Sequence, residues 1–183
     1  MATKIPTLET ERLILRPFEL SDAKRVQELA GDFELARTTA NVPHPYEDGM
    51  AEGWISTHAD GWEERTGVTW AVVAKHDDAM IGCMHITLAM QHEAGEMGYW
   101  IGRPYWGTGF GTEAAQAVVD YAFGILKLHR VYAVHMGKNP GSGRVMQKVG
   151  MTYEGTMREA EVRWGERDDI AIYGILQHEW AAQ

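Results

Sequence analysis

The chain is poor in cysteine and has no long apolar run. Its 183 residues contain a single cysteine, Cys83, so an internal disulfide is excluded and this residue alone cannot form a thiolate metal site. No apolar run approaches the roughly 18 residues of a membrane-spanning helix, and residues 1–6 lack the apolar core of a signal peptide. We therefore expect a cytoplasmic protein that does not contact membranes.

Basic residues are also scarce. The 17 lysines and arginines stand against 26 aspartates and glutamates, which gives a formal net charge of −9. Such a balance argues against a protein that grips duplex nucleic acid over its whole surface. Internal repeats and low-complexity stretches are missing as well, which excludes a solenoid. The length and the 45% hydrophobic content predict one globular domain over residues 1–183.

Hydrophobic periodicity predicts a mixed α/β domain with a central sheet. Alternating patterns indicate seven strands, near residues 11–18, 69–75, 80–90, 94–102, 130–136, 151–158 and 168–176. Helical patterns cover residues 21–30, 50–64, 109–126 and 139–149. Residues 31–49, which include two prolines, are expected to be irregular.

Glycine is the residue in surplus, with 20 copies. Three of them, Gly107, Gly109 and Gly111, lie between a predicted strand and the clearest predicted helix. Glycines there let backbone amides approach an anion closely, and the helix N-terminus adds a partial positive charge. The segment therefore predicts a phosphate-binding turn. The alternative is a tight turn in which the glycines only permit positive φ.

The glycines alone do not identify the phosphate ligand. The spacing Gly109-x-Gly111-x-x-Ala114 formally fits a dinucleotide fingerprint, which keeps an NADP-binding oxidoreductase as one alternative. However, the acidic residue expected about 20 residues later is missing, because the next predicted strand is followed by Gly137 and Lys138. A nucleotide P-loop would also need Gly-Lys-Ser/Thr after its glycines, and that motif is absent from the sequence.

Three ordered blocks resemble the GNAT acetyltransferases, specifically the RimJ and RimL branch of ribosomal-protein N-terminal acetyltransferases. They are EMGYWIG at residues 96–102, YWGTGFGTEA at 105–114 and NPGSGRVMQKVGM at 139–151. The segments ETERLILR at residues 9–16 and YGILQHEW at 173–180 also resemble the first strand and the ending of that branch. The resemblance spans nearly the whole chain.

The resemblance implies a GNAT fold, with flanking helices and a mixed, splayed central sheet of about seven strands. Acetyl-CoA would lie between the fourth and fifth strands. Its pantetheine arm would run beside Tyr99, Trp100 and Ile101, and its pyrophosphate would rest on the amides of residues 107–112, namely Gly107, Thr108, Gly109, Phe110, Gly111 and Thr112. Trp106 stands where the family has glutamine or arginine, so phosphate contact would depend on backbone amides and nearby cations.

The same resemblance assigns catalytic candidates. Glu96 matches a carboxylate that accepts a proton from the amine, directly or through water; alternatively it satisfies backbone groups or faces solvent. Ser142 matches a hydroxyl near the CoA sulfur, with helix capping as the alternative. Many family members have a tyrosine acid where Met146 stands, and methionine cannot donate a proton. Asn139 would cap the helix and touch the pantetheine amide, and Arg144 would reach a CoA phosphate or solvent.

The implied activity is transfer of an acetyl group from acetyl-CoA to a primary amine by direct attack in a ternary complex. Because Trp106 and Met146 depart from the family, a non-catalytic CoA-binding regulator of the same fold stays an alternative. A homodimer is a family-based expectation. The eight histidines form no evident ligand cluster, so no metal is expected.

Charge is uneven along the chain. Residues 103–148 hold six bases and two acids, which suits a polyanionic ligand such as CoA. Residues 31–64 hold one base, Arg37, and eight acids, namely Asp32, Glu34, Glu47, Asp48, Glu52, Asp60, Glu63 and Glu64. In this branch that segment resembles the acceptor side, so the acids predict a cationic acceptor such as a basic peptide N-terminus or a polyamine. Solvated helix faces are the alternative.

Overall fold

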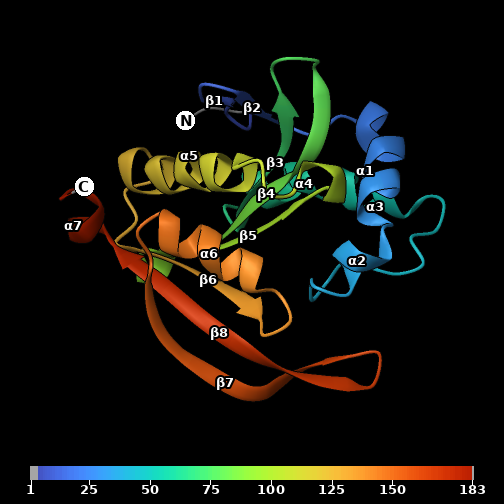
Figure 1. Ribbon diagram of the computed structural model, residues 1–183. Coiled ribbons are helices and arrows are strands. Elements are labelled where there is room, and N and C mark those ends of the chain that lie inside the picture. The colour runs from blue at the N-terminus through green and yellow to red at the C-terminus, as the bar shows by residue number, and fades with distance from the viewer. Residues whose placement is uncertain (1–3, 183) are drawn as a thin grey trace.

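A mixed sheet of eight strands organises residues 4–182, which the computed structural model describes (Figure 1). The strands are β1 Leu8–Glu9, β2 Leu13–Arg16, β3 Gly67–Ala74, β4 Ala79–Ala89, β5 Ala94–Ile101, β6 Arg130–Met136, β7 Thr152–Arg163 and β8 Glu166–Leu176. Their order in the sheet is β1-β2-β3-β4-β5-β6-β8-β7. All neighbours are antiparallel except β5 and β6. The predicted mixed α/β fold is therefore confirmed.

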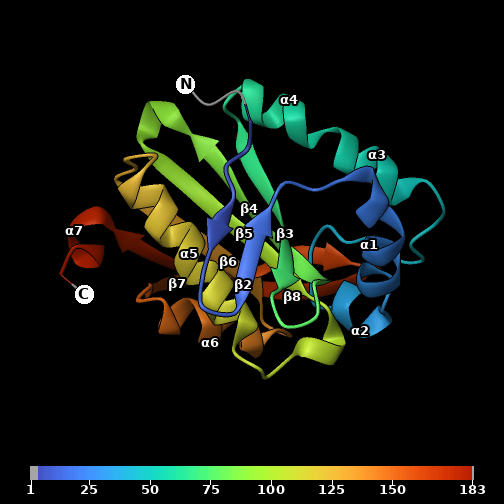
Figure 2. The same cartoon turned by 90° about the horizontal axis from the view of Figure 1, so that it is seen from above.

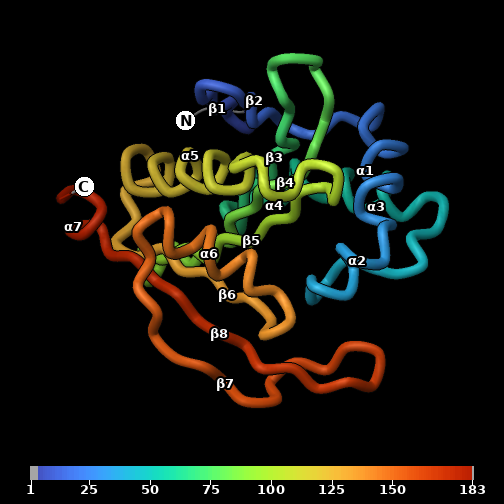
Figure 3. Tube along the Cα trace, viewed as in Figure 1, coloured from blue at the N-terminus to red at the C-terminus, as the bar shows by residue number. Residues whose placement is uncertain are grey.

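The described helices are α1 Ala23–Ala30, α2 Phe33–Ala36, α3 Met50–Ser56, α4 His58–Glu63, α5 Phe110–Gly124, α6 Pro140–Lys148 and α7 Gln177–Trp180. The longest, α5, crosses over from β5 to β6, because parallel neighbours cannot be joined by a short hairpin. The tube in Figure 3 follows this crossover and shows the long β7–β8 hairpin extending past the helices. The crossover places the N-terminus of α5 directly after β5.

Several predicted elements differ from the structure, and β7 continues to Arg163, five residues past its predicted end. The sheet has eight strands rather than about seven, because β1 is only two residues long and carries no readable periodicity. The helix predicted over residues 50–64 divides at Thr57, where the Ser56 and Thr57 hydroxyls donate to the carbonyls of Gly53 and Trp54 and compete with the helical bonds. The region expected to be irregular contains the short helix α2.

Two apolar cores lie on opposite faces of the sheet, because alternate strand residues point to opposite sides. One core packs residues such as Trp70 and Met84 against α5 and α6. The other packs residues such as Val73 and Trp100 against α1 and α3. In Figure 2, α1, α3 and α4 follow one another along one side of the molecule. The face under α1 and α3 is thereby separated from the face under α5 and α6.

Candidate active site

The sheet opens between β5 and β6. These strands pair only where Ala94–Glu96 faces Arg130–Tyr132, although β5 continues to Ile101 and β6 to Met136. Beyond the paired residues, side chains from both faces of the sheet can reach one space. This arrangement agrees with the splayed sheet that the family resemblance implies.

A cavity of about 960 Å³ reaches this opening and continues under α3 and α4. Of the predicted site residues, the cavity wall includes Glu96, Tyr99, Trp100, Asn139 and Ser142. Tyr99 packs with the α5 and α6 core, whereas Trp100 belongs to the α1 and α3 core, so the cavity is reached from both faces. Ile101, Arg144 and residues 106–112 lie outside the described wall. The structure therefore separates a reaction cavity from the glycine-rich turn.

Glu96 is half-buried on β5, and its Oε2 accepts a hydrogen bond of 3.1 Å from the Tyr132 hydroxyl. Burial, followed by the Glu96 carboxylate, raises the pKa of Tyr132, so the phenol stays protonated and keeps donating. Glu96 also faces Thr87 across the β4–β5 pair. The carboxylate is thus held at the cavity wall, where it can accept a proton. Tyr132 was not a sequence candidate, since only the parallel register brings it beside Glu96.

Ser142 and Tyr99 form a hydroxyl pair. The Tyr99 hydroxyl lies 2.7 Å from Ser142 Oγ and 3.1 Å from the Ser142 carbonyl oxygen. Burial raises the pKa of the Tyr99 phenol, so it remains a proton carrier at neutral pH. Met146, where the family resemblance implies a tyrosine, is fully buried in the core. Sequence reasoning gave Tyr99 only a binding role and missed its contact with Ser142.

Asn139 caps α6, as predicted. Its Oδ1 accepts a hydrogen bond of 3.1 Å from the Ser142 amide, and its Nδ2 donates to the Thr38 carbonyl at 3.1 Å. Ser142 lies inside the helix, so its hydroxyl is free of the capping role that was the alternative. The Asn139 side chain therefore ties the N-terminus of α6 to the segment after α2 and fixes the position of Ser142.

The glycine loop, residues 106–112, adopts a backbone that requires glycine. Gly107 and Gly109 have φ values of 77° and 87°, in the left-handed region. Gly109 is the N-cap of α5 and provides no side-chain cap, so the first-turn amides are left for another acceptor. The Trp106 indole donates to the Ile101 carbonyl at 2.6 Å and fastens the loop to the end of β5. These features fit an anionic group such as the CoA pyrophosphate.

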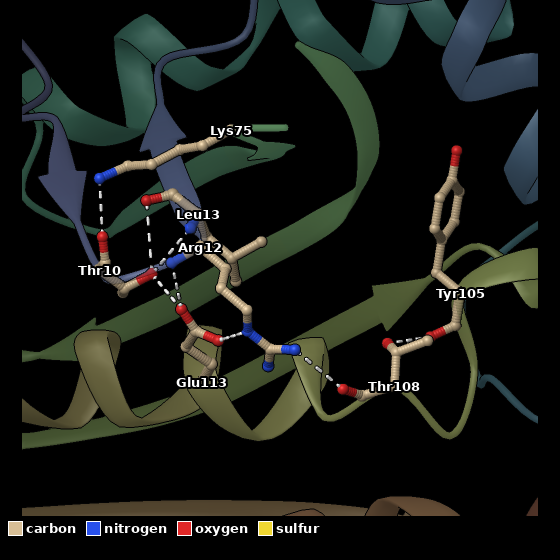
Figure 4. A network of polar contacts seen from close by, with 7 residues as sticks. All are labelled: Thr10, Arg12, Leu13, Lys75, Tyr105, Thr108 and Glu113. Atoms are coloured by element: carbon tan, nitrogen blue, oxygen red, sulfur yellow. Dashed lines mark hydrogen bonds and ion pairs between the residues drawn. The ribbon is translucent and has the colours of Figure 1, made fainter. Parts of the chain in front are cut away.

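A polar network holds the glycine loop from the side of β2 (Figure 4). Glu113 accepts 2.6 Å hydrogen bonds from Arg12 Nε and from the Thr10 hydroxyl, and Arg12 Nη1 donates to the Thr108 carbonyl at 3.1 Å. The Arg12 guanidinium also lies 4.6 Å from the centre of the Phe110 ring. Burial alone would raise the pKa of Glu113, but the hydrogen bonds from Thr10 and Arg12 lower it overall. Arg12 is thus a cation beside the loop that the sequence analysis did not single out.

The other end of the cavity is covered by the acceptor loop, residues 37–43, and by α3 and α4. Arg163, at the end of β7, donates to the carbonyls of Ala36 at 3.2 Å and Ala40 at 2.9 Å, and also to that of Val42. Next to it, the Trp164 ring stacks on Phe33 of α2 with the ring centres 5.4 Å apart. The hairpin tip therefore supports the acceptor loop.

The eight acids of residues 31–64 take no part in the described cavity wall. Among residues 4–182, no cluster of three His, Cys, Asp or Glu side chains could hold a metal ion. Cys83 is buried, and burial raises the pKa of its thiol, so it is not a nucleophile at neutral pH. None of the described helices is long and apolar enough to cross a membrane.

Comparison with known proteins gives a consistent result. The family model described as acetyltransferase (GNAT) domain matches residues 12–152. The N-acetyltransferase YoaA of Bacillus subtilis is 31% identical over 173 residues, which are 94% of this chain and 97% of YoaA.

Solved structures agree with this result. A GNAT-family acetyltransferase from Bacillus anthracis has a TM-score of 0.83 at 26% identity and covers 94% of this chain and 99% of its own. Spermidine N-acetyltransferase from Vibrio cholerae, solved with CoA and spermine, shares the fold with a TM-score of 0.81 at 21% identity, over 94% of this chain and 99% of its own. The family match covers most of the sequence, and the curated relative covers nearly all of it. The chain therefore belongs to the GNAT acetyltransferase family.

Proposed function

We propose that the protein is an acetyl-CoA-dependent N-acetyltransferase that acetylates a primary amine by direct attack in a ternary complex. The observation that carries this proposal is the joint position of Glu96 and the Ser142–Tyr99 pair on one cavity at the splayed strands. One group accepts a proton and the other supplies one, which are the two proton-handling roles that acetyl transfer needs. Members of this family use acetyl-CoA as the donor.

The donor would bind along β5 and the glycine loop. The first-turn amides of α5 would hold the pyrophosphate, with Arg12 as the neighbouring cation. The pantetheine arm would run beside Tyr99 and Trp100 toward the cavity, which brings the thioester near Ser142. Arg144 is exposed on α6 and is available to a CoA phosphate.

The acceptor amine must lose a proton before it attacks, because ammonium groups with pKa values near 8 or 10.4 are mostly charged at pH 7. Glu96 would accept that proton. The free amine then forms a bond to the thioester carbonyl carbon, the carbon–sulfur bond breaks, and the new amide nitrogen loses its second proton to water. The CoA thiolate takes up a proton through the Ser142–Tyr99 hydroxyl pair, which regains a proton from solvent.

Two measurements test this function. Isothermal titration should show acetyl-CoA binding, and a thiol-release assay with a panel of amines should show turnover. Absence of acetyl-CoA and CoA binding would contradict the proposal. Binding without turnover of any amine or peptide would favour the CoA-binding regulator. That alternative rests on Trp106 and Met146, which differ from the family pattern. Tighter binding of NADP than of CoA would favour the oxidoreductase.

The finer assignments stay predictions. These are the RimJ and RimL branch, the homodimer and the cytoplasmic location. A cationic acceptor also stays a prediction. The Vibrio cholerae relative was solved in complex with spermine, which is cationic. In this chain, however, the eight acids that suggested a cationic acceptor lie outside the described cavity wall.

A further inference from the structure

His58, the first residue of α4, is a buried polar side chain without a described partner. It is 9% exposed, lines the cavity, and neither ring nitrogen has a hydrogen-bond partner among the residues that the structure describes. Its ring packs edge-on against Trp54 at 4.5 Å and lies 5.3 Å from Phe18. A buried donor or acceptor left unpaired is costly, so these nitrogens call for a partner inside the cavity.

The strands β3, β4 and β5 contribute polar side chains to the cavity wall, namely Thr69, His85, Thr87 and Glu96. His85 of β4 is fixed by Thr69, at 2.8 Å from Nδ1, and by Thr87, at 2.9 Å from Nε2. In the β4–β5 register, Thr87 faces Glu96 and His85 faces Gly98. A Cβ atom built at Gly98 would meet nothing within 4 Å, so the space beside His85 and Glu96 is open. This space can take a small acceptor.

The described wall carries little charge. Glu96 is its only carboxylate, and neither lysine nor arginine belongs to it. Desolvation lowers the pKa of His58 to about 4, with nearby His85 adding to the effect, and burial also lowers the pKa of His85. Both imidazoles are therefore neutral at pH 7. The His85 nitrogens are taken by Thr69 and Thr87, so His58 is the one that can offer a donor and an acceptor nitrogen. A second ammonium group inside this cavity would have no carboxylate to pair with.

We propose, resting on the acetyltransferase function above, that the acceptor is a primary amine with an uncharged, hydrogen-bonding body, bound over Gly98 with its amino group at Glu96 and its polar group at His58. The chemical class of the acceptor follows from the residues that line the cavity. Glu96 takes the one cationic group, the Trp54 ring covers apolar atoms, and the neutral His58 imidazole pairs with a hydroxyl or amide. His58 is then a specificity residue of the acceptor site.

The test uses two pairs of small amines that differ by a hydroxyl, tyramine against phenethylamine and serinamide against alaninamide, with spermidine as a polycation. The native protein should prefer the hydroxylated member of at least one pair by about tenfold in kcat/KM, because an unpaired buried group costs that much. Spermidine should be slower than that member. The His58→Phe variant should bring the ratio close to one, because phenylalanine keeps the contacts with Phe18 and Trp54 and removes both nitrogens.

The controls separate this site from general damage. His76→Phe changes an exposed histidine in the β3–β4 turn and should leave the ratio unchanged. Acetyl-CoA affinity should be the same in both variants. The inference is overturned if neither pair shows a preference, if His58→Phe retains it, or if spermidine is the faster substrate. Each of these outcomes still leaves an active acetyltransferase.

If no amine turns over, the proposed acetyltransferase function is contradicted. The acceptor site at His58 can then still be tested by a binding measurement. The imidazole nitrogen signals of His58 are followed by nuclear magnetic resonance in the CoA complex while tyramine or serinamide is added. A shift of the His58 signals with a hydroxylated amine, and none with spermidine, supports the acceptor site. Unchanged signals with both hydroxylated amines contradict it.

Discussion

The donor side and the acceptor side of the cavity are built differently. Most of the donor side comes from one stretch of chain, residues 94–142, which holds β5, the glycine loop, α5, β6 and the start of α6; Arg12 joins it from the segment before β2. The acceptor side combines the acceptor loop, α3, α4, the start of β3 and the second half of β4, and the tip of the β7–β8 hairpin supports it. A cofactor site made of backbone groups can be read from local sequence, whereas the acceptor site depends on tertiary packing.

The two sides also differ in how they handle charge. Beside the glycine loop, the first-turn amides of α5 have no side-chain cap, and the Arg12 cation lies next to them in an ion pair with Glu113. In the acceptor cavity, neutral imidazoles and aromatic rings share the wall with a single carboxylate, that of Glu96. The difference suggests that changes on one side should leave binding on the other side intact, and the following predictions test that separation.

The largest effect is expected at the junction of the two sides. Glu96→Gln should lower kcat for an alkylamine by about 10²-fold, because the amide cannot accept the ammonium proton. Acetyl-CoA affinity, measured by titration, should not change. The matched control is Glu63→Gln, which removes one of the exposed acids of α4 outside the cavity and should leave kcat unchanged. An unaltered kcat in Glu96→Gln would show that water or another group is the base.

The next effect concerns the donor side. Gly109→Val should weaken acetyl-CoA binding by about tenfold, because a β-branched residue is strained at φ 87° and the amides of the loop would shift. KM for the amine should be nearly unchanged. Gly124→Ala in the last turn of the same helix serves as control, since its Cβ meets nothing within 4 Å. Equal losses of donor and acceptor affinity in Gly109→Val would break the proposed separation.

A smaller effect is expected at the hairpin tip. Arg163→Met should raise KM for the amine several-fold and lower the free energy of unfolding by about 1–3 kcal/mol, because the loop carbonyls of Ala40 and Val42 and the α2 carbonyl of Ala36 each lose a donor. Acetyl-CoA affinity should stay the same. Arg167→Met removes only a surface ion pair of 3.9 Å on the same hairpin and should be close to neutral. An unchanged KM in Arg163→Met would mean that the loop holds its shape without the hairpin.

The smallest effect is a pH dependence of stability. His58 has a pKa of about 4 in the fold against 6.5 for the ordinary group. As the pH falls from 6.5 toward 4, His58 binds a proton in the unfolded chain but stays neutral in the folded protein. The free energy of unfolding therefore falls over this pH range. His85, whose pKa is also lowered, acts in the same direction. Urea unfolding of His58→Phe between pH 7 and pH 4.5 should show a shallower fall, and an identical slope would contradict a buried neutral His58.

Much of the fold could be predicted from local patterns. Alternation and capping residues located seven of the eight strands and placed α5 and α6 to within about two residues at each end. Errors arose where local signals are weak or compete. The two-residue strand β1 has no period, and the hydroxyls of Ser56 and Thr57 break a helix whose hydrophobic pattern continues.

The sequence by itself predicted the glycine loop at the start of α5 and the Asn139 cap of α6, because positive-φ glycines, a helix start and a capping asparagine are local features with local signals. Only the tertiary structure decided the pairs that shape the chemistry. Tyr132 meets Glu96 across 36 residues, Tyr99 meets Ser142 across 43 and Arg12 meets Glu113 across 101. His58 and His85 likewise lie on separate elements. Such contacts depend on strand register and helix packing, and no short stretch of sequence encodes either.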